Sequence, residues 1–293
     1  EAKALRKLHH VIGRTSWDYA RALELNPEVT YHFCNETLRQ NFYEGQWNYV
    51  GCRKHSVFAS SCSYPIKGFH YLLEAMAKVR KTYPDATITV TGRSYLGGGW
   101  KQQLRRGSYE AYLGKLTRKY HLEDAVRFLG DLSAEEMKRS FLEANVFVLP
   151  STMENSPNSL GEAMLLGVPC VAADVGGVSN MMRSGTEGYV YQSSAPYMLA
   201  HYIREVFEGE ALAQNMGSLA REHTGFYHSA IAPRLYGKLV QPATGVDHKG
   251  QVAVVKITPG QVFLLAIQHT DDTFLNKGKA ELRFDHFFSR YYA

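Results

Sequence analysis

The stretch "PSTMENSPNSLGEAMLLGVPCVAADVGG", from Pro150 to Gly177, decides the fold. The apolar run "NVFVLP" (145–150) leads into it and is typical of a buried strand. A loop rich in Pro, Asn and Ser then gives way to a helical pattern over "NSLGEAMLLG" (158–167) and to a second strand, "VPCVAAD" (168–174). A strand, a helix and a further buried strand predict a βαβ unit with parallel strands.

The same alternation extends outward over residues 56–240. Further strands are predicted at "SVFAS" (56–60), "TITVTG" (87–92) and "AVRFLG" (125–130). Helices are predicted from Phe69 to near "TYPDA" (82–86), at 108–121 and after the capping pair Ser133 and Glu136. Strands that alternate with helices of this length are typical of a parallel sheet covered on both faces. The fold class is therefore α/β, with a Rossmann-like doubly wound parallel sheet.

The composition is that of a soluble globular protein of one large or two modest domains. The 293 residues are 45% hydrophobic and 21% charged, and the net charge of +5 comes without a Lys/Arg block, which argues against a nucleic-acid partner. The four cysteines form no CxxC pair, which favours reduced thiols in a cytoplasmic protein. No apolar run reaches 18 residues, so we expect no membrane crossing.

Five polar or glycine-bearing loops each follow a predicted strand. They are "SSCSYPIKG" (60–68), "GRSYLGGGW" (92–100), "FLGD" (128–131), "PSTMENSPNS" (150–159) and "DVGGV" (174–178). Strand–helix loops are often polar without binding anything. Ligands of such sheets, however, bind beyond the carboxyl ends of the strands, so these loops predict a ligand site.

Within the quoted stretch, Asn158, Ser159 and Leu160 would form the first helical turn. Backbone N–H groups at a helix start lack intrahelical partners, and the helix dipole favours an anion there. Glu154 lies upstream on the loop, and Glu162 lies about one turn inside the helix. Each acid alone would more often be a solvated surface group. Carboxylates accept hydrogen bonds from hydroxyls, so two of them flanking an anion site predict a nucleotide sugar.

These residues resemble the donor-binding segment of retaining glycosyltransferases of the two-domain GT-B architecture, in the family-four group. The hallmark is two glutamates separated by seven residues, then a Gly-x-Pro strand and a Gly-Gly loop, present as Glu154 and Glu162, 167–169 and 176–177. "IKGFHYLLEAM" (66–76), "VRFLGDLSAEEM" (126–137) and "ANVFVLPS" (144–151) match in the same order. The resemblance spans about residues 8–240.

The resemblance implies a role for each matching position. Lys67 would contact the diphosphate and Glu154 the sugar hydroxyls, so these two form the expected catalytic pair, while Glu162 would bind the ribose. Gly92 would leave room for the nucleotide, and main-chain groups near Phe128 and Leu129 would meet the base. The remaining donor-binding positions are Asn155, Ser156, Pro157, Asn158, Ser159 and Leu160.

The activity implied is transfer of a hexose from a UDP- or GDP-sugar to a sugar, glycolipid or other glycoconjugate acceptor, with retention, as in polysaccharide biosynthesis. No Asp-x-Asp motif is present, so neither a metal nor another cofactor is expected. The sequence departs from the family where Cys62 stands in place of an arginine that would contact the diphosphate, and Arg93 is the expected substitute. A non-catalytic nucleotide-sugar binder is the alternative, and a nucleotide-sugar epimerase is a third and weaker one.

The predicted division is a remnant of the N-terminal acceptor domain with the crossover at 1–50, the donor domain at 51–240 and an extension at 241–293. Residues 8–43 resemble the last strand and helix of an acceptor domain, so we expect a fragment or a chain that pairs with another. His9 and His10 there are either catalytic or, as favoured, structural.

Residues 241–293 have no counterpart in the family, and two features stand out in them. Residues 250–267 are typical of a β-hairpin that turns at 258–260. Apolar residues recur at helical spacing in the tail "AELRFDHFFSRYYA" (280–293). That pattern fits an amphipathic segment on a membrane or partner chain, or, as favoured, packing against the body or terminal disorder.

Overall fold

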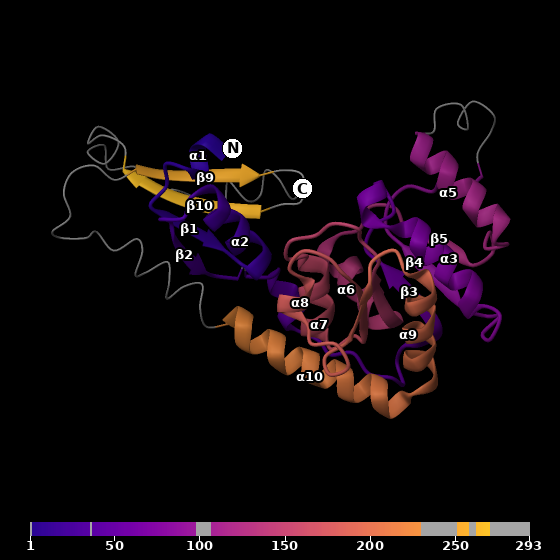
Figure 1. The fold of residues 1–293 in the computed structure, drawn as a ribbon. Helices are drawn as coiled ribbons and strands as arrows, with labels where there is room; N and C mark the ends of the chain where they lie inside the picture. Colours follow the sequence, from indigo (N-terminus) through magenta and orange to yellow (C-terminus); the bar gives the residue numbers. More distant parts are fainter. Residues whose placement is uncertain (1, 36, 98–106, 230–250, 258–261, 270–293) are drawn as a thin grey trace.

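The computed structural model describes residues 2–35, 37–97, 107–229, 251–257 and 262–269. Two β-sheets organise this part of the chain, and Figure 1 shows them in separate parts of the molecule. We call them the large sheet and the small sheet. The large sheet carries the loops predicted to bind a ligand.

The large sheet has six parallel strands in the order β5-β4-β3-β6-β7-β8. Their bounds are β3 Arg53–Ala59, β4 Thr87–Val90, β5 Val126–Phe128, β6 Ala144–Leu149, β7 Cys170–Asp174 and β8 Tyr189–Gln192. The order reverses between β3 and β6, which is the point where doubly wound sheets bind ligands. The predicted fold class is confirmed.

Helices cover this sheet. They are η2 Pro65–Lys67, α3 Phe69–Val79, α5 Ser108–Lys119, α6 Ala134–Glu143, α7 Asn158–Leu166, α8 Val178–Met181, α9 Pro196–Glu208 and α10 Glu210–Ser229. The capping pair predicted from Ser133 and Glu136 is present at the start of α6. Helix α7 is buried on most sides, and α10 runs beneath it (Figure 1), which explains its continuous apolar pattern. Rings of Phe58, Phe141 and Phe147 fill the core with centroids 5.0–6.2 Å apart.

The small sheet joins the two ends of the described chain in the order β2-β1-β10-β9. Its elements are α1 Ala2–Leu5, β1 His10–Gly13, α2 Ser16–Leu25, β2 Thr30–Phe33, β9 Gln251–Ile257 and β10 Val262–His269. Strands β9 and β10 pair antiparallel, which confirms the predicted hairpin strands, and β10 also pairs antiparallel with β1. The hairpin turn and the predicted amphipathic tail lie outside the described residues.

The segment between the two sheets is fastened along helix α7. It contains the short helix η1 (Gln40–Tyr43), whose Phe42 is fully buried against Phe141. Further along, the backbone N–H of Trp47 donates to Leu166 O over 2.8 Å. This crossover segment therefore lies on the helix that carries Glu162.

Candidate functional site

The loop after β3 brings Lys67 to the switch point of the large sheet. Helix η2 ends at Gly68, whose φ of 65° is left-handed. A Cβ at Gly68 would lie 1.8 Å from Pro150 O, so only glycine lets this loop approach the end of β6 so closely. The Thr152 N–H donates to Ile66 O over 2.8 Å and ties the two loops together.

Lys67 and Glu154 meet in this junction. The Lys67 Nζ lies 2.7 Å from Glu154 Oε1, and the Ser151 hydroxyl donates to the same oxygen over 2.8 Å. The Glu154 side chain is 12% exposed and that of Lys67 33% exposed, so the pair is open to solvent mainly through its cation. The structure thus brings together the two residues expected to act on the donor.

The Gly-Gly loop after β7 fits against the backbone that carries Glu154. A Cβ at Gly176 would lie 1.6 Å from Glu154 O, and the φ of Gly176 is +54°. The Gly177 N–H donates to Asn155 O over 2.9 Å. Close approach of backbone to backbone is therefore the reason for this glycine pair, and it holds the loop that carries Glu154.

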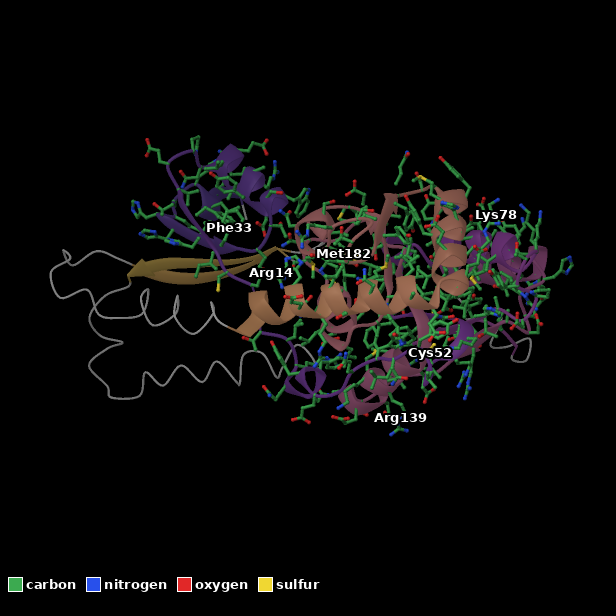
Figure 2. All side chains as sticks on the ribbon, turned by 90° about the horizontal axis from the view of Figure 1, so that it is seen from below. Arg14, Phe33, Cys52, Lys78, Arg139 and Met182 are labelled. Atoms are coloured by element: carbon green, nitrogen blue, oxygen red, sulfur yellow. The ribbon has the colours of Figure 1, made fainter. Side chains whose placement is uncertain are left out.

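Helix α7 begins beside this pair, as predicted. Pro157 is its N-cap, and the N–H groups of Leu160 and Gly161 both donate to Pro157 O. Arg14, which directly follows β1, donates from Nη1 to Asn158 Oδ1 over 3.3 Å. Figure 2 shows Arg14 on the side of the small sheet that faces the rest of the molecule. A cation therefore reaches the start of α7 from the small sheet.

Asn155, in the loop that follows β6, contacts residues next to the small sheet and does not face open space. The Asn155 side chain is buried, donates to Asp18 Oδ2 over 3.0 Å and accepts from the Thr15 hydroxyl over 2.6 Å. Burial and the neighbouring Asp18 raise the pKa of Tyr31, whose hydroxyl donates to that carboxylate. The expected contribution of Asn155 to a donor is thus restricted to its backbone.

The two serines of the loop are both half-buried. The Ser156 hydroxyl lies 3.5 Å from Met181 Sδ, and Ser159 is half-buried in the first turn of α7. Leu160 is fully buried and its N–H donates to Pro157 O, so neither its side chain nor its amide is available to a ligand.

Glu162 is buried and paired. Its Oε1 lies 2.7 Å from Arg39 Nε and its Oε2 lies 2.8 Å from Arg39 Nη2, a two-point contact. Its side chain is 5% exposed, whereas that of Arg39 is 44% exposed. Burial raises the pKa of Glu162, and the hydrogen bonds and charge of Arg39 act in the opposite direction. The arginine belongs to the crossover segment, directly before η1.

A cavity of about 210 Å³ lies at the ends of β3, β4 and β5. It is lined by Cys62, Ser63, Gly92, Arg93, Tyr95, Glu110 and Asp131. Gly92 has a φ of 101°, and its N–H donates to Gly130 O over 2.9 Å. This cavity is where the sequence predicts the nucleotide, since two of the predicted residues line it.

Two features limit what the surrounding residues can offer a nucleotide. The Leu129 N–H already donates to Val90 O and so is not available to the cavity, and the ring of Phe128 packs edge-on against Tyr95. Burial raises the pKa of the Cys62 thiol to about 11, so this group supplies no charge. Arg93, an exposed residue, shares the cavity with the acidic residues Glu110 and Asp131.

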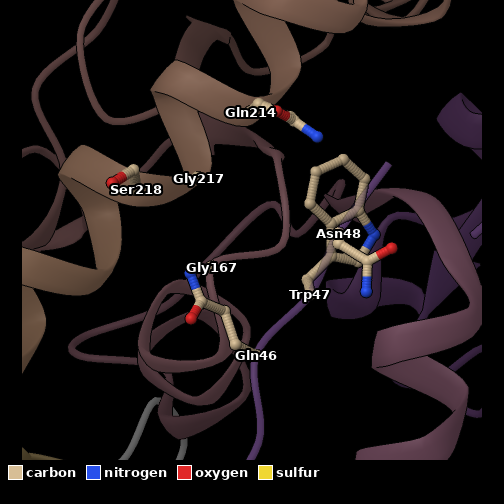
Figure 3. A pocket seen from close by; sticks show the side chains of 7 residues that line it. All are labelled: Gln46, Trp47, Asn48, Gly167, Gln214, Gly217 and Ser218. Carbon is tan, nitrogen blue, oxygen red and sulfur yellow. The ribbon is translucent and has the colours of Figure 1, made fainter. Parts of the chain in front are cut away.

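A larger cavity, of about 350 Å³, lies elsewhere (Figure 3). It is lined by Gln46, Trp47, Asn48, Gly167, Gln214, Gly217 and Ser218, and so sits between the crossover segment, the end of α7 and α10. It contains none of the predicted site residues and no charged side chain. We therefore assign the candidate site to the loops of the large sheet.

The remaining expectations from sequence concern a histidine, the cysteines, a metal and a membrane span. His10 lies in the small sheet, where its ring nitrogen is 3.1 Å from that of His32 on the neighbouring strand. The four cysteines are buried and form no disulfide. Within the described ranges, no three His, Cys, Asp or Glu side chains gather in a way that could hold a metal. Likewise, none of the described helices combines the length and apolar character needed to span a bilayer.

Two residues of this site were missed from the sequence. Arg14 follows a strand end, and the rule that ligands bind beyond strand ends would have pointed to it if applied to β1 as well. Arg39 carries no such signal, because 123 positions separate it from Glu162.

Comparison with known families points to the same part of the chain. Residues 54–223 match the family model described as glycosyl transferases group 1. The chain is 31% identical over 170 residues to a D-inositol 3-phosphate glycosyltransferase of Corynebacterium diphtheriae, which covers 58% of this chain and 38% of that protein. It is 28% identical over 156 residues to a glycogen synthase of Mycobacterium tuberculosis, covering 53% and 34%. The chain spans only 34–40% of the length of such curated relatives.

Solved structures share the fold. Sucrose-phosphate synthase from Thermosynechococcus elongatus superposes with a TM-score of 0.68 at 22% identity, over 81% of this chain and 60% of that one. Anabaena HepE, solved in complex with UDP, gives 0.66 at 20% identity, over 79% and 63%. At these identities the likeness establishes the architecture.

Proposed function

Because the chain belongs to the glycosyl transferases group 1 family, we propose that it transfers a hexose from a UDP- or GDP-sugar to a sugar or glycoconjugate acceptor, with retention. One observation carries the proposal. Lys67 and Glu154 form a 2.7 Å pair where the loops of β3 and β6 meet, next to the start of α7. A cation, a hydroxyl acceptor and a helix start in one place are what a sugar diphosphate requires.

The chemistry follows from the charge that develops in the reaction. As the sugar leaves, negative charge grows on the diphosphate, and groups fixed beforehand stabilise it best. An ammonium has three donors, so Lys67 can bind a phosphate oxygen while it keeps Glu154. Glu154 would accept from sugar hydroxyls and hold the ring over the leaving group. No step in this scheme requires a metal ion.

The second diphosphate cation is better assigned to Arg14 than to Arg93. Arg14 touches Asn158, the first residue of α7, whereas Arg93 lines the cavity with Glu110 and Asp131. Two acidic neighbours reduce the positive potential that a phosphate would meet. The nucleoside would occupy the 210 Å³ cavity and reach toward Glu162 with its ribose.

The test is a thermal-shift screen with UDP-glucose, UDP-N-acetylglucosamine and GDP-mannose, followed by calorimetry with the best ligand. A bound donor raises the melting temperature by mass action. We expect Glu162→Gln to weaken nucleotide binding about tenfold, the loss expected for charged hydrogen bonds to hydroxyls. Glu154→Gln should leave nucleotide affinity nearly unchanged and remove turnover. The reverse pattern would refute the two roles, and absence of any binding would refute the function.

A non-catalytic nucleotide-sugar binder is the second candidate, favoured by Cys62. Its neutral, buried thiol stands where the resemblance expects an arginine. Donor hydrolysis separates the two candidates, because a transferase hydrolyses its donor slowly when no acceptor is present. Saturable binding without hydrolysis, and without transfer to any of a panel of oligosaccharides, would favour the binder.

A further inference from the structure

The pair Arg39–Glu162 joins a segment inside the family match to a segment outside it. Glu162 lies within residues 54–223, which match the family model, whereas Arg39 lies in the crossover segment outside that range. The guanidinium contacts both carboxylate oxygens, at 2.7 and 2.8 Å, and its carbon lies 4.5 Å from the centre of the buried Phe42 ring. The guanidinium is therefore held by two partners, the carboxylate of Glu162 and the ring of Phe42.

We propose that Arg39 is a positioning residue for nucleotide binding: it keeps Glu162 ionised and aimed, so that the carboxylate can accept hydrogen bonds from the ribose. This inference rests on the proposed function and adds to it a residue that the family match does not include. Arg39 acts on the nucleotide through Glu162, without touching it.

Lone-pair geometry allows the shared use. A carboxylate has about four acceptor positions, and the two-point contact with Arg39 takes one on each oxygen. One position on each oxygen then remains for the two ribose hydroxyls. The fork fixes the plane of the carboxylate, and with it the direction of the remaining lone pairs.

Burial makes the cation necessary. Glu162 is only 5% exposed, and a buried carboxylate without a partner takes up a proton instead of remaining charged. Among the described residues, the charged partner of Glu162 is Arg39. Lys138 of α6 donates instead to Asn41 O, and Arg221 of α10 to Gly45 O and Leu165 O.

The crossover segment gains a role from this arrangement. Phe42 and the Trp47–Leu166 hydrogen bond fix it along α7, so a shift of this segment would move Arg39 off Glu162. Nucleotide affinity would thus depend on the chain that leads from the small sheet.

The experiment measures calorimetric affinity for UDP, GDP and ADP in the full chain. Whichever of these binds the wild type serves as the probe for Arg39→Gln, Arg39→Lys, Glu162→Gln and the double variant Arg39→Gln/Glu162→Gln. We expect Arg39→Gln to weaken binding about tenfold, the scale of charged hydrogen bonds. Arg39→Lys should restore part of it. In the Glu162→Gln background, Arg39→Gln should have no further effect.

A pH profile separates positioning from a structural role. In Arg39→Gln the carboxyl loses the cation that lowers its pKa, so its proton is lost only at higher pH. The affinity defect should therefore shrink as the pH rises and Glu162 ionises even without Arg39. A merely structural defect would be independent of pH. The matched control is Arg53→Gln, which removes an exposed 3.4 Å pair with Glu143 and should change nothing.

The outcomes are distinct. If the wild type binds none of the nucleotides, the proposed function fails and this inference with it. If the wild type binds and folded Arg39→Gln binds equally well or more tightly, the inference alone is overturned. An additive loss in the double variant would also overturn it, because Arg39 would then act on the ligand directly. The neutral double variant contains no unpaired buried charge, so this comparison survives if Arg39→Gln is unstable.

Discussion

The two glutamates of one motif obtain their cations from different parts of the chain. Glu154 pairs with Lys67, and both belong to loops of the large sheet. Glu162, on the next helix, pairs with Arg39 of the crossover segment. The carboxylate of the first pair is 12% exposed and that of the second 5%, and both pairs open to solvent mainly through their cations. One motif therefore combines a pair made within the loops of the large sheet with a pair that depends on distant sequence.

Removing the carboxylate of the local pair should have the largest effect. We expect Glu154→Gln to lower kcat at least about 100-fold, the scale for loss of a transition-state contact, with little change in nucleotide affinity. The measurement is steady-state transfer beside calorimetric binding. Equal losses of affinity and rate would remove the distinction between the two glutamates.

The glycine behind Glu154 is the next test of the local pair. Gly176→Ala places a methyl group 1.6 Å from Glu154 O at a φ of +54°, so we expect a loss of about 3 kcal/mol in unfolding free energy, as for other strained and overpacked sites. Gly185→Ala is the matched control, because its φ of +78° is similar but nothing lies within 4 Å. It should cost about 1 kcal/mol by denaturant unfolding. Equal costs would show that the close approach is unimportant.

The next prediction concerns Arg14, the cation that follows β1 of the small sheet. Arg14→Gln should weaken nucleoside diphosphate binding about tenfold and leave nucleoside binding unchanged, because only the diphosphate needs the charge. Arg93→Gln should change either affinity less than about threefold, since two acidic residues share its cavity. Calorimetry with UDP and uridine tests both variants. A greater loss in Arg93→Gln would return the role to the residue predicted from sequence.

The smallest effect is expected from pH and concerns the buried pair. The folded chain raises the pKa of Glu162, so it binds this proton more tightly than the unfolded chain does. Stability should therefore fall as the pH rises through the interval between the unfolded and folded pKa values, and level off above it. Chemical denaturation of wild type and Glu162→Gln at several pH values isolates this contribution. A stability of the wild type relative to Glu162→Gln that decreases toward low pH would contradict the direction of the shift.

Much of the fold followed from sequence because its signals are local. Helix α3 begins at the predicted Phe69 and ends at Val79, shortly before the predicted end near 82–86, and the capping pair at Ser133 fixes the start of α6. Lys67, Glu154 and the Gly-Gly loop could be placed together because the ends of parallel strands meet at one edge. That edge rule relates loops to one another without knowledge of side-chain packing.

What sequence could not supply depends on contacts between distant segments. The side chain of Asn155 turns to Asp18 and Thr15, 137 and 140 positions away, and nothing in its local pattern marks that choice. The contact between Arg39 and Glu162 also joins residues far apart in the sequence, and no local pattern marks it. The Arg93 assignment relied on its position after a strand and could not foresee the acids beside it.

The pairing of Val11 with Ala266 has a consequence for how this molecule assembles. Most strands of the large sheet pair with the strand before or after them in the chain, and β3 pairs with β6 across the switch point, whereas β1 must wait for β10, which lies much further along the chain. Closing so long a loop is slow compared with forming neighbouring crossovers. On a ribosome the large sheet could fold before β10 emerges, whereas the small sheet could not.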